Sequence, residues 1–373
     1  NTMYYQDDFA KVFRKEEDLH EHLLDLDERS WWKRVQGKRI KVLAVAGNSD
    51  RLTPVEGEDM ELLTYDTLKN TGLMIEAGGE AYLLGSTAVP TLYGRARISG
   101  AVLAELERKK LAGILNECLA LSKGKALLHF SEGKIRAMPS GDKGKYSIIQ
   151  MLDIFMAASA YIGEGFDKTS FAGGYASHML TNAAWSVKDT RMIDAYRELL
   201  KHYGRSDTSD MVTNVRITTS DVTASGVNIA YSIQTGGETI LLGQTLKTVH
   251  RGTDGIRQVE EHIQNIFSYY KETLQGAGKL MGIPIQYPVN TLVGMMHKNF
   301  GKKLIAETAE NFKSENGDLP CTAYDVYCGI CHALVIAQSK GATTRALLEL
   351  EETISQCITR RWQDYDMPGE VKY

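Results

Sequence analysis

The pattern of apolar residues predicts an α+β fold, in which an antiparallel sheet is followed by a helical C-terminal third. Between residues 227 and 234, apolar side chains alternate with small or polar ones, which is the period of a strand with one buried face. After residue 255, apolar residues recur at three- and four-residue spacing, which is typical of amphipathic helices. Because strands and helices form separate blocks, the pattern favours an antiparallel sheet over a doubly wound parallel one.

Turn residues and changes of period divide the first 210 residues into elements. Glu132-Gly133 separates two short apolar runs and predicts a β-hairpin. Ser99 is placed to cap a helix, because its hydroxyl can accept a hydrogen bond from a backbone N–H. The segment 169–188 is rich in Ser, Gly and Ala and gives no assignment. The predicted elements are a helix over 16–26, a strand over 39–46, strands and turns over 71–93, a helix over 98–119, a hairpin of 125–130 with 134–138, a loop over 141–145, and helices over 148–161 and 190–203.

The clearest strand signal predicts a three-stranded antiparallel meander over residues 211–250, with a tight turn at Gly236-Gly237. We expect one face of its middle strand to be buried, and the other to meet solvent, a ligand or a partner protein. The buried set is Val227, Ile229, Tyr231 and Ile233, and the polar set includes Asn228, Ser232 and Gln234. One helical stripe is predicted over 256–274, and further helices around 290–312, 322–339 and 344–360.

Length and composition indicate a globular chain with more than one structural unit. The 373 residues are 43% hydrophobic and 24% charged, enough apolar content for a large core. We divide the chain into an α/β segment over 1–95, a mixed core with the meander over 96–250, and a helical part over 251–373 packed on the same core. No apolar run reaches about 18 residues, so a membrane span is not expected. The acidic first 25 residues and an odd number of cysteines, five, favour a cytoplasmic setting.

Basic residues gather in two segments, although the net charge of the chain is −4. Residues 31–41 hold five bases and no acid, and residues 123–145 hold six bases and two acids. Lysine and arginine neutralise phosphates, and aromatic rings stack on unpaired bases. The alternative interpretation is a solvated charged face with two core tryptophans. Lys134 and Arg136 are two apart in the hairpin and should point to one face. The candidate nucleic-acid-binding residues are Trp31, Trp32, Lys33, Arg34, Lys123, Lys125, Lys134, Arg136, Lys143, Lys145 and Tyr146.

Cys328-Gly-Ile-Cys331-His332 matches the spacing of a haem-attachment motif, and Cys321 precedes it by one heptad as a potential zinc ligand. The motif lies inside an apolar helical pattern, and no fourth zinc ligand is apparent. We therefore interpret these cysteines as buried helix residues and expect neither a metal nor a cofactor.

A second candidate site follows the third predicted strand, where His250, Arg251 and Asp254 open a helix. Strand ends often hold functional residues, so a pocket for a small molecule or nucleotide is one interpretation. The other is that Asp254 caps the helix and His250 lies on the surface. No nucleophile–base pair, phosphate loop or metal set is visible, so we assign no catalytic residue.

Three stretches of the chain resemble the phage/plasmid-like protein family, a prokaryotic domain of unknown function. The likeness spans roughly residues 95–358. It departs from the family pattern at Cys328-Gly329, where Asn-Ala is expected, and at the insertion 141–145. The motifs that carry it are Lys134-Ile-Arg136-Ala-Met-Pro-Ser140 with Tyr146 and Met151-Leu-Asp153, Val215-Arg216-Ile217 through Gly243 and His250, and Thr322-Ala-Tyr324-Asp-Val-Tyr327 with Ala333 and Ser339.

The resemblance implies a protein carried by phages, plasmids and integrated elements, and it brings no established reaction. Together with the basic clusters, it leads us to predict a non-catalytic protein that binds single-stranded DNA in recombination or replication. Two alternatives stay open. One is a protein-interaction role, such as a host-defence antagonist, and the other is an enzyme with a pocket near His250. A homo-oligomer is compatible with either.

Overall fold

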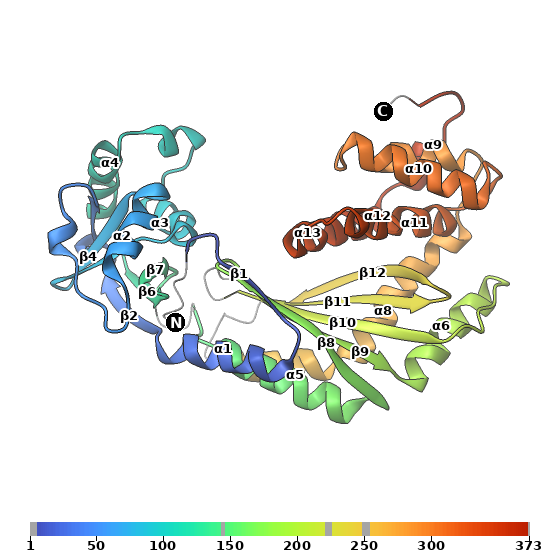
Figure 1. The fold of residues 1–373 in the computed structure, drawn as a ribbon, viewed down its shortest axis with the longest axis horizontal. Helices are drawn as coiled ribbons and strands as arrows, with labels where there is room; N and C mark the ends of the chain where they lie inside the picture. The colour runs from blue at the N-terminus through green and yellow to red at the C-terminus, as the bar shows by residue number, and fades with distance from the viewer. Residues whose placement is uncertain (1–5, 143–145, 221–225, 248–253, 372–373) are drawn as a thin grey trace.

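A computed structural model describes residues 6–142, 146–220, 226–247 and 254–371. The chain forms two lobes, which Figure 1 shows side by side. We call residues 31–142 the N-lobe, and residues 6–29 together with 146–371 the sheet lobe. The fold is α+β with antiparallel sheets and a helical C-terminal region, which confirms the predicted fold class. In the described residues no helix is both long enough and apolar enough to span a bilayer.

The sheet lobe is built on a six-stranded antiparallel sheet. The predicted meander forms its second half, and the unassigned segment 169–188 forms a hairpin that extends the meander on one side. A strand from the start of the chain completes the edge. The strands, in sheet order, are β1 (Ala10–Phe13), β8 (Lys168–Ser177), β9 (Thr181–Lys188), β10 (Met211–Thr219), β11 (Val227–Thr235) and β12 (Glu238–Lys247).

The alternation that predicted the meander is visible in its burial. Along β11 the side chains of Val227, Ile229, Tyr231 and Ile233 are buried, as predicted. Gly236 and Gly237 turn the chain into β12 with φ of 57° and 84°, values that residues with a side chain rarely adopt. The sheet therefore has one apolar and one polar face.

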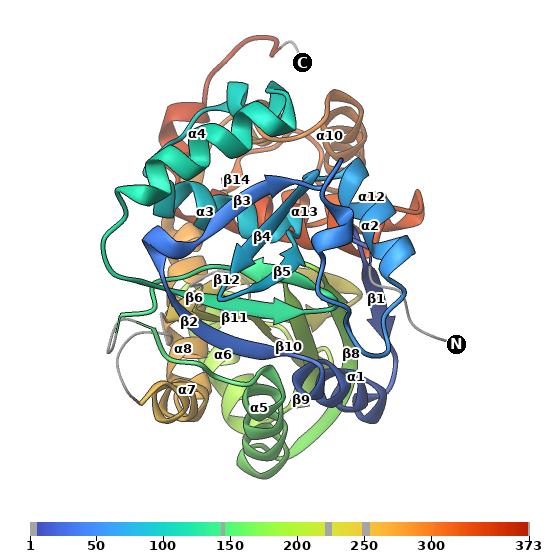
Figure 2. The same ribbon diagram turned by 90° about the vertical axis from the view of Figure 1, so that its left-hand side faces the viewer.

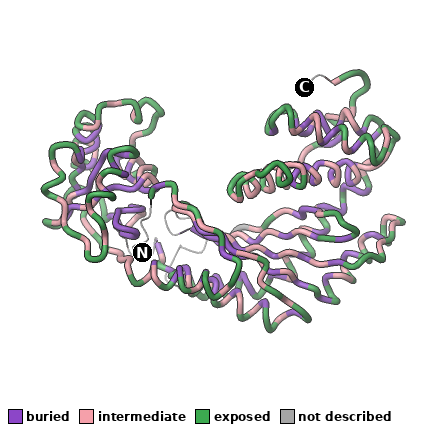
Figure 3. Tube along the Cα trace, viewed as in Figure 1, coloured by how far each residue is buried: buried purple, intermediate pink, exposed green. Residues whose placement is uncertain are grey.

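Helices cover the two faces differently (Figures 1 and 3). On the apolar face lie α1 (Glu16–Glu28), α5 (Met151–Gly165), α7 (Gly255–Gln264) and α8 (Ile266–Gly278), and α6 (Thr190–His202) packs on α8. The polar face is partly covered by α11 (Ala323–Cys331) and α13 (Thr344–Ser355), which contact β12. The remaining C-terminal elements are α9 (Pro288–Met296), α10 (Lys302–Asn316), α12 (Ala333–Ser339) and the short paired strands β13 (Pro284–Ile285) and β14 (Cys321–Thr322).

The N-lobe contains two three-stranded antiparallel sheets, seen end-on to the other lobe in Figure 2. Glu132 and Gly133, with φ of 54° and 77°, form the tight turn of the predicted hairpin, which is thereby confirmed. One sheet is β2 (Trp31–Gln36), β6 (Lys125–Ser131) and β7 (Lys134–Ala137), the other is β3 (Lys41–Ala44), β4 (Leu73–Ala77) and β5 (Glu80–Leu83), and the helices are α2 (Met60–Lys69), α3 (Val89–Ala96) and α4 (Arg108–Ala120).

Two predicted helices are interrupted. The segment 98–119 contains a short 3₁₀ turn, an extended residue at Leu106, and then α4. Glu107, rather than Ser99, caps α4, because its carboxylate accepts hydrogen bonds from the backbone N–H groups of Lys109 and Lys110. The stripe over 256–274 is broken at Asn265, where α7 ends and α8 begins. Periodicity continued through both breaks because each pair of segments buries one shared apolar face.

The hydrophobic cores group the chain differently from the predicted segments. One core joins residues 13–26 of the first segment to residues 149–362, across the expected boundary at 250. A second core joins residues 40–138, across the expected boundary at 95. The boundaries were placed on changes of period, whereas the cores are set by the pairing of distant strands.

Candidate nucleic-acid interface

The two basic residues at the centre of the predicted DNA-binding surface, Lys134 and Arg136, are buried. They point to one face of β7, as expected, but their exposed fractions are 0% and 1%. Lys134 Nζ lies 2.7 Å from Asp66 Oδ2 and 3.3 Å from Asp7 Oδ1. Arg136 Nη1 lies 2.7 Å from Asp7 Oδ1. A phosphate therefore has no access to either side chain, and the prediction that they form a binding surface is wrong.

This buried cluster connects the two lobes. Asp7 precedes β1 of the sheet lobe, and its carboxylate also accepts a hydrogen bond from the backbone N–H of Ser86 in the N-lobe. The backbone N–H of Asp7 donates to Asp66 in return. Glu132 completes the cluster through Arg136, at 3.2 Å. Buried charges are tolerated only when paired in this way, so Lys134 and Arg136 have a structural role.

The predicted aromatic residues pack mainly on other rings. Trp31 stacks on Phe130, with ring centroids 4.9 Å apart. Trp32 stacks on His129 at 3.9 Å and contacts Tyr146 at 5.6 Å. Tyr146 is only 7% exposed and does not offer a free face for base stacking. Trp32 is half-buried, so part of its indole stays at the surface.

Three of the predicted basic residues remain exposed without a carboxylate partner among the described residues: Arg34, Lys123 and Lys125. Lys33 is exposed but pairs with Glu80 at 2.8 Å. Lys143 and Lys145 lie outside the described residues.

Three further bases lie beside these, and the sequence analysis did not select them. Gly37 and Gly124 are hydrogen-bonded between β2 and β6, and the side chains of Arg95 and Ser122 lie against Gly37. This contact brings the end of α3 next to the strands. A separation of some sixty residues in sequence hid it, and the pair in Gly94-Arg95-Ala-Arg97 was the only local signal. We define the basic rim as Arg34, Lys38, Arg95, Arg97, Lys123 and Lys125.

A cavity of about 360 Å³ opens within the basic rim. Arg95, Arg97 and Lys123 line it, with hydroxyl groups at its wall and one carboxylate, Asp142. Arg95 is half-buried, and its Nε–H has no hydrogen-bond acceptor among the described residues. Burial also lowers the pKa of Arg95. A half-buried guanidinium with an unsatisfied donor is a group that an anion would stabilise.

The basic rim differs from other basic residues of the N-lobe in its charge balance. Arg51 and Lys33 form ion pairs with Glu76 and Glu80. None of the six rim residues forms an ion pair with a carboxylate in the described part of the chain. Because like charges repel, an uncompensated cluster of this kind costs free energy unless an anionic partner offsets it.

The cysteine motif lies in the helical C-terminal region. Cys331 is buried and Cys328 is half-buried by surface exposure. Burial raises the pKa of Cys331 to about 12 and of Cys321 to about 11, and raises that of Cys328 further. Thiols with raised pKa values stay protonated and are poor metal ligands. Within the described ranges, no three His, Cys, Asp or Glu side chains are arranged to hold a metal ion.

The second candidate site is only partly described. His250 and Arg251 lie outside the described residues. Asp254 is the residue before α7, as the capping alternative predicted, although its side chain makes no capping hydrogen bond. It is exposed and lies 4.0 Å from Arg257. The polar residues proposed for a partner protein divide: Asn228 and Ser232 line a cavity under α13, and Gln234 is exposed.

Comparison of the chain with protein-family models, with curated proteins and with solved structures finds no match to any of the three. The resemblance to the phage/plasmid-like protein family therefore stays a prediction.

Proposed function

We propose that the chain binds single-stranded DNA through the basic rim, as a non-catalytic protein. The observation that supports this is the group of six unpaired bases around a cavity in which the Arg95 Nε–H lacks an acceptor. Phosphate oxygens are strong acceptors, and arginine can hold them with two parallel hydrogen bonds. With a net charge of −4 for the whole chain, the attraction has to be local.

Trp32 favours a single strand over a duplex in this proposal. Trp32 and Arg34 are two apart in β2 and so lie on one face of the strand. An indole beside a guanidinium offers a stacking surface next to a phosphate contact, and only unpaired bases can use it. The resemblance adds a mobile-element context, in which recombination and replication both expose single strands.

The test is fluorescence anisotropy with a labelled oligonucleotide at several salt concentrations. The double variant Arg95→Gln, Lys123→Gln should bind more weakly and reduce the salt slope by about two units, because two phosphate contacts are lost. Arg51→Gln is the matched control, since Arg51 is also a surface base of the N-lobe but pairs with Glu76. The control should leave the slope unchanged.

Two outcomes would contradict the proposal. One is that the wild-type chain shows no binding at low salt. The other is that the double variant binds with the same affinity and slope as the wild type. In either case the protein-interaction alternative becomes the better hypothesis, and co-purification with a partner protein is its test.

A further inference from the structure

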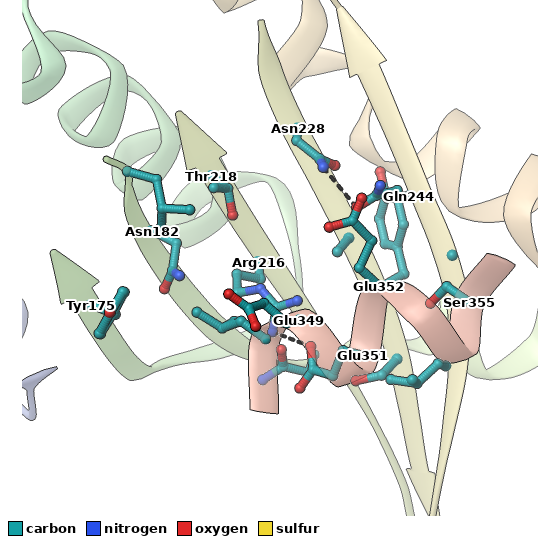
Figure 4. Close-up of a pocket in the computed structure, with 18 of the residues that line it drawn as sticks. Tyr175, Asn182, Arg216, Thr218, Asn228, Gln244, Glu349, Glu351, Glu352 and Ser355 are labelled. Carbon is teal, nitrogen blue, oxygen red and sulfur yellow. Dashed lines mark hydrogen bonds and ion pairs between the residues drawn. The ribbon is translucent and has the colours of Figure 1, made fainter. Parts of the chain in front are cut away.

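A second cavity lies between the polar face of the large sheet and α13 (Figure 4). Its volume is about 200 Å³, smaller than the roughly 300 Å³ at which pockets for drug-sized ligands begin. Asn182 of β9, Arg216 and Thr218 of β10 and Asn228 of β11 point into it from the sheet. Glu352 lies opposite them on α13.

Three polar atoms in this wall have no hydrogen-bond partner among the described residues. They are Asn182 Nδ2, Arg216 Nε and Asn228 Oδ1. Asn182 is only 4% exposed, so water reaches its amide poorly. Buried polar groups are nearly always paired, and unpaired ones that converge on one cavity indicate a missing partner. Two of the atoms are donors and one is an acceptor, so the partner needs both functions.

Charge balance limits the class of ligand. Arg216 is already paired with Glu351, and Arg345 with Glu349 at 3.0 Å. Glu352 forms no ion pair with a described residue, so the cavity carries a net negative charge. An anionic ligand would be repelled, whereas sugar hydroxyl groups could donate to the carboxylate. Leu180 and Leu348 add apolar wall for the faces of a ring.

We propose that this cavity binds an uncharged nucleobase as the free base or nucleoside. The edge of a nucleobase presents adjacent donors and acceptors, which matches the three unpaired atoms. Its flat apolar faces match the leucine walls, and its size suits the volume. The inference does not depend on DNA binding by the basic rim, because it rests on different residues in the other lobe.

The test is a thermal shift with adenosine, guanosine, cytidine and uridine, each beside its 5′-monophosphate. At least one nucleoside should raise Tm by roughly 3 °C when present at about 100 times its Kd. Its monophosphate should give a smaller shift, because Glu352 repels the added charge. The absence of a shift with all four nucleosides at millimolar concentration would overturn the proposal, and so would an equal shift with the monophosphate.

Two variants locate the site. Asn182→Leu should abolish the shift while leaving the Tm of the free protein unchanged or higher, because an unpaired buried amide is removed. Arg216→Lys keeps a charge beside Glu351 but lacks the Nε–H, and should weaken nucleoside binding about tenfold by calorimetry. Gln234→Leu is the control, since Gln234 is exposed on the same face but outside the cavity lining. Unaltered binding by Arg216→Lys would place the nucleoside elsewhere.

Discussion

Two sets of basic side chains in the N-lobe lie on neighbouring strands in opposite environments. On β7, Lys134 and Arg136 are buried and share the carboxylates of Asp7, Asp66 and Glu132. At the basic rim, residues such as Arg95 and Lys123 have no carboxylate partner among the described residues. The first set resembles a structural lock and the second an open site for an anion. The number of lysines and arginines in a segment therefore says less about binding than the number of acids that the fold brings to them.

The strongest way to break this comparison is to remove a base from the buried set. Lys134→Ala leaves Asp66 buried with its closest cation gone, and we expect the free energy of unfolding to fall by about 3–5 kcal/mol. Lys123→Ala, at the rim, should change it by less than about 0.5 kcal/mol. Chemical denaturation of both variants measures the difference. If Lys134→Ala costs under about 1 kcal/mol, the buried cluster does not hold the lobes together.

A second buried base, His22 of α1, extends the comparison to pH. Burial between Phe9 and Phe13, and the nearby charge of Lys11, lower the pKa of His22 to about 4. The unfolded chain, with a histidine pKa near 6.5, binds the proton first. Stability from His22 is therefore complete above about pH 6.5 and is lost as the pH falls towards 4. At about 1.4 kcal/mol per pKa unit, the loss is roughly 3 kcal/mol.

Denaturation at several pH values measures this loss. His22→Phe keeps an aromatic ring in the stack and should flatten the stability profile between pH 6.5 and 4. His202→Gln, at the exposed end of α6, should follow the wild-type profile. A wild-type profile as flat as that of His22→Phe would show that His22 does not titrate with folding.

The sequence predicted features that depend on local patterns. Alternation along 227–233 and the turn at Gly236-Gly237 predicted the meander, because period 2 and positive φ are local properties. Glu132-Gly133 predicted the β6–β7 hairpin in the same way. The helix breaks at Leu106 and Asn265 were missed, since an apolar stripe continued across them.

The candidate site was predicted only in part, because burial depends on contacts between distant segments. Lys134 and Arg136 carry the same alternating pattern as exposed strand residues, and nothing near them in sequence announces Asp7, 127 and 129 positions away. Arg95 joins the rim through packing against Gly37. Arg34, Lys123 and Lys125 were placed correctly because strand pairing kept them at the surface.

The smallest expected effect concerns the one acid in the rim cavity, Asp142. Its carboxylate accepts the backbone N–H of Lys125 at 3.1 Å and lies against Gly124, so it is a turn residue as well as a local negative charge. Asp142→Asn retains an oxygen for that hydrogen bond and removes the charge. If a DNA phosphate occupies the cavity, the loss of repulsion near a screened surface amounts to about 0.5–1 kcal/mol. We therefore expect Asp142→Asn to bind the oligonucleotide about three times more tightly at low salt, with the gain disappearing as salt rises. The free energy of unfolding should change by less than about 1 kcal/mol, which denaturation can check. Asp59→Asn, at the start of α2, also removes an acid of the N-lobe and serves as the matched control for net charge. Equal gains in both variants would mean that only overall charge matters, and weaker binding by Asp142→Asn would place the phosphate outside the rim cavity.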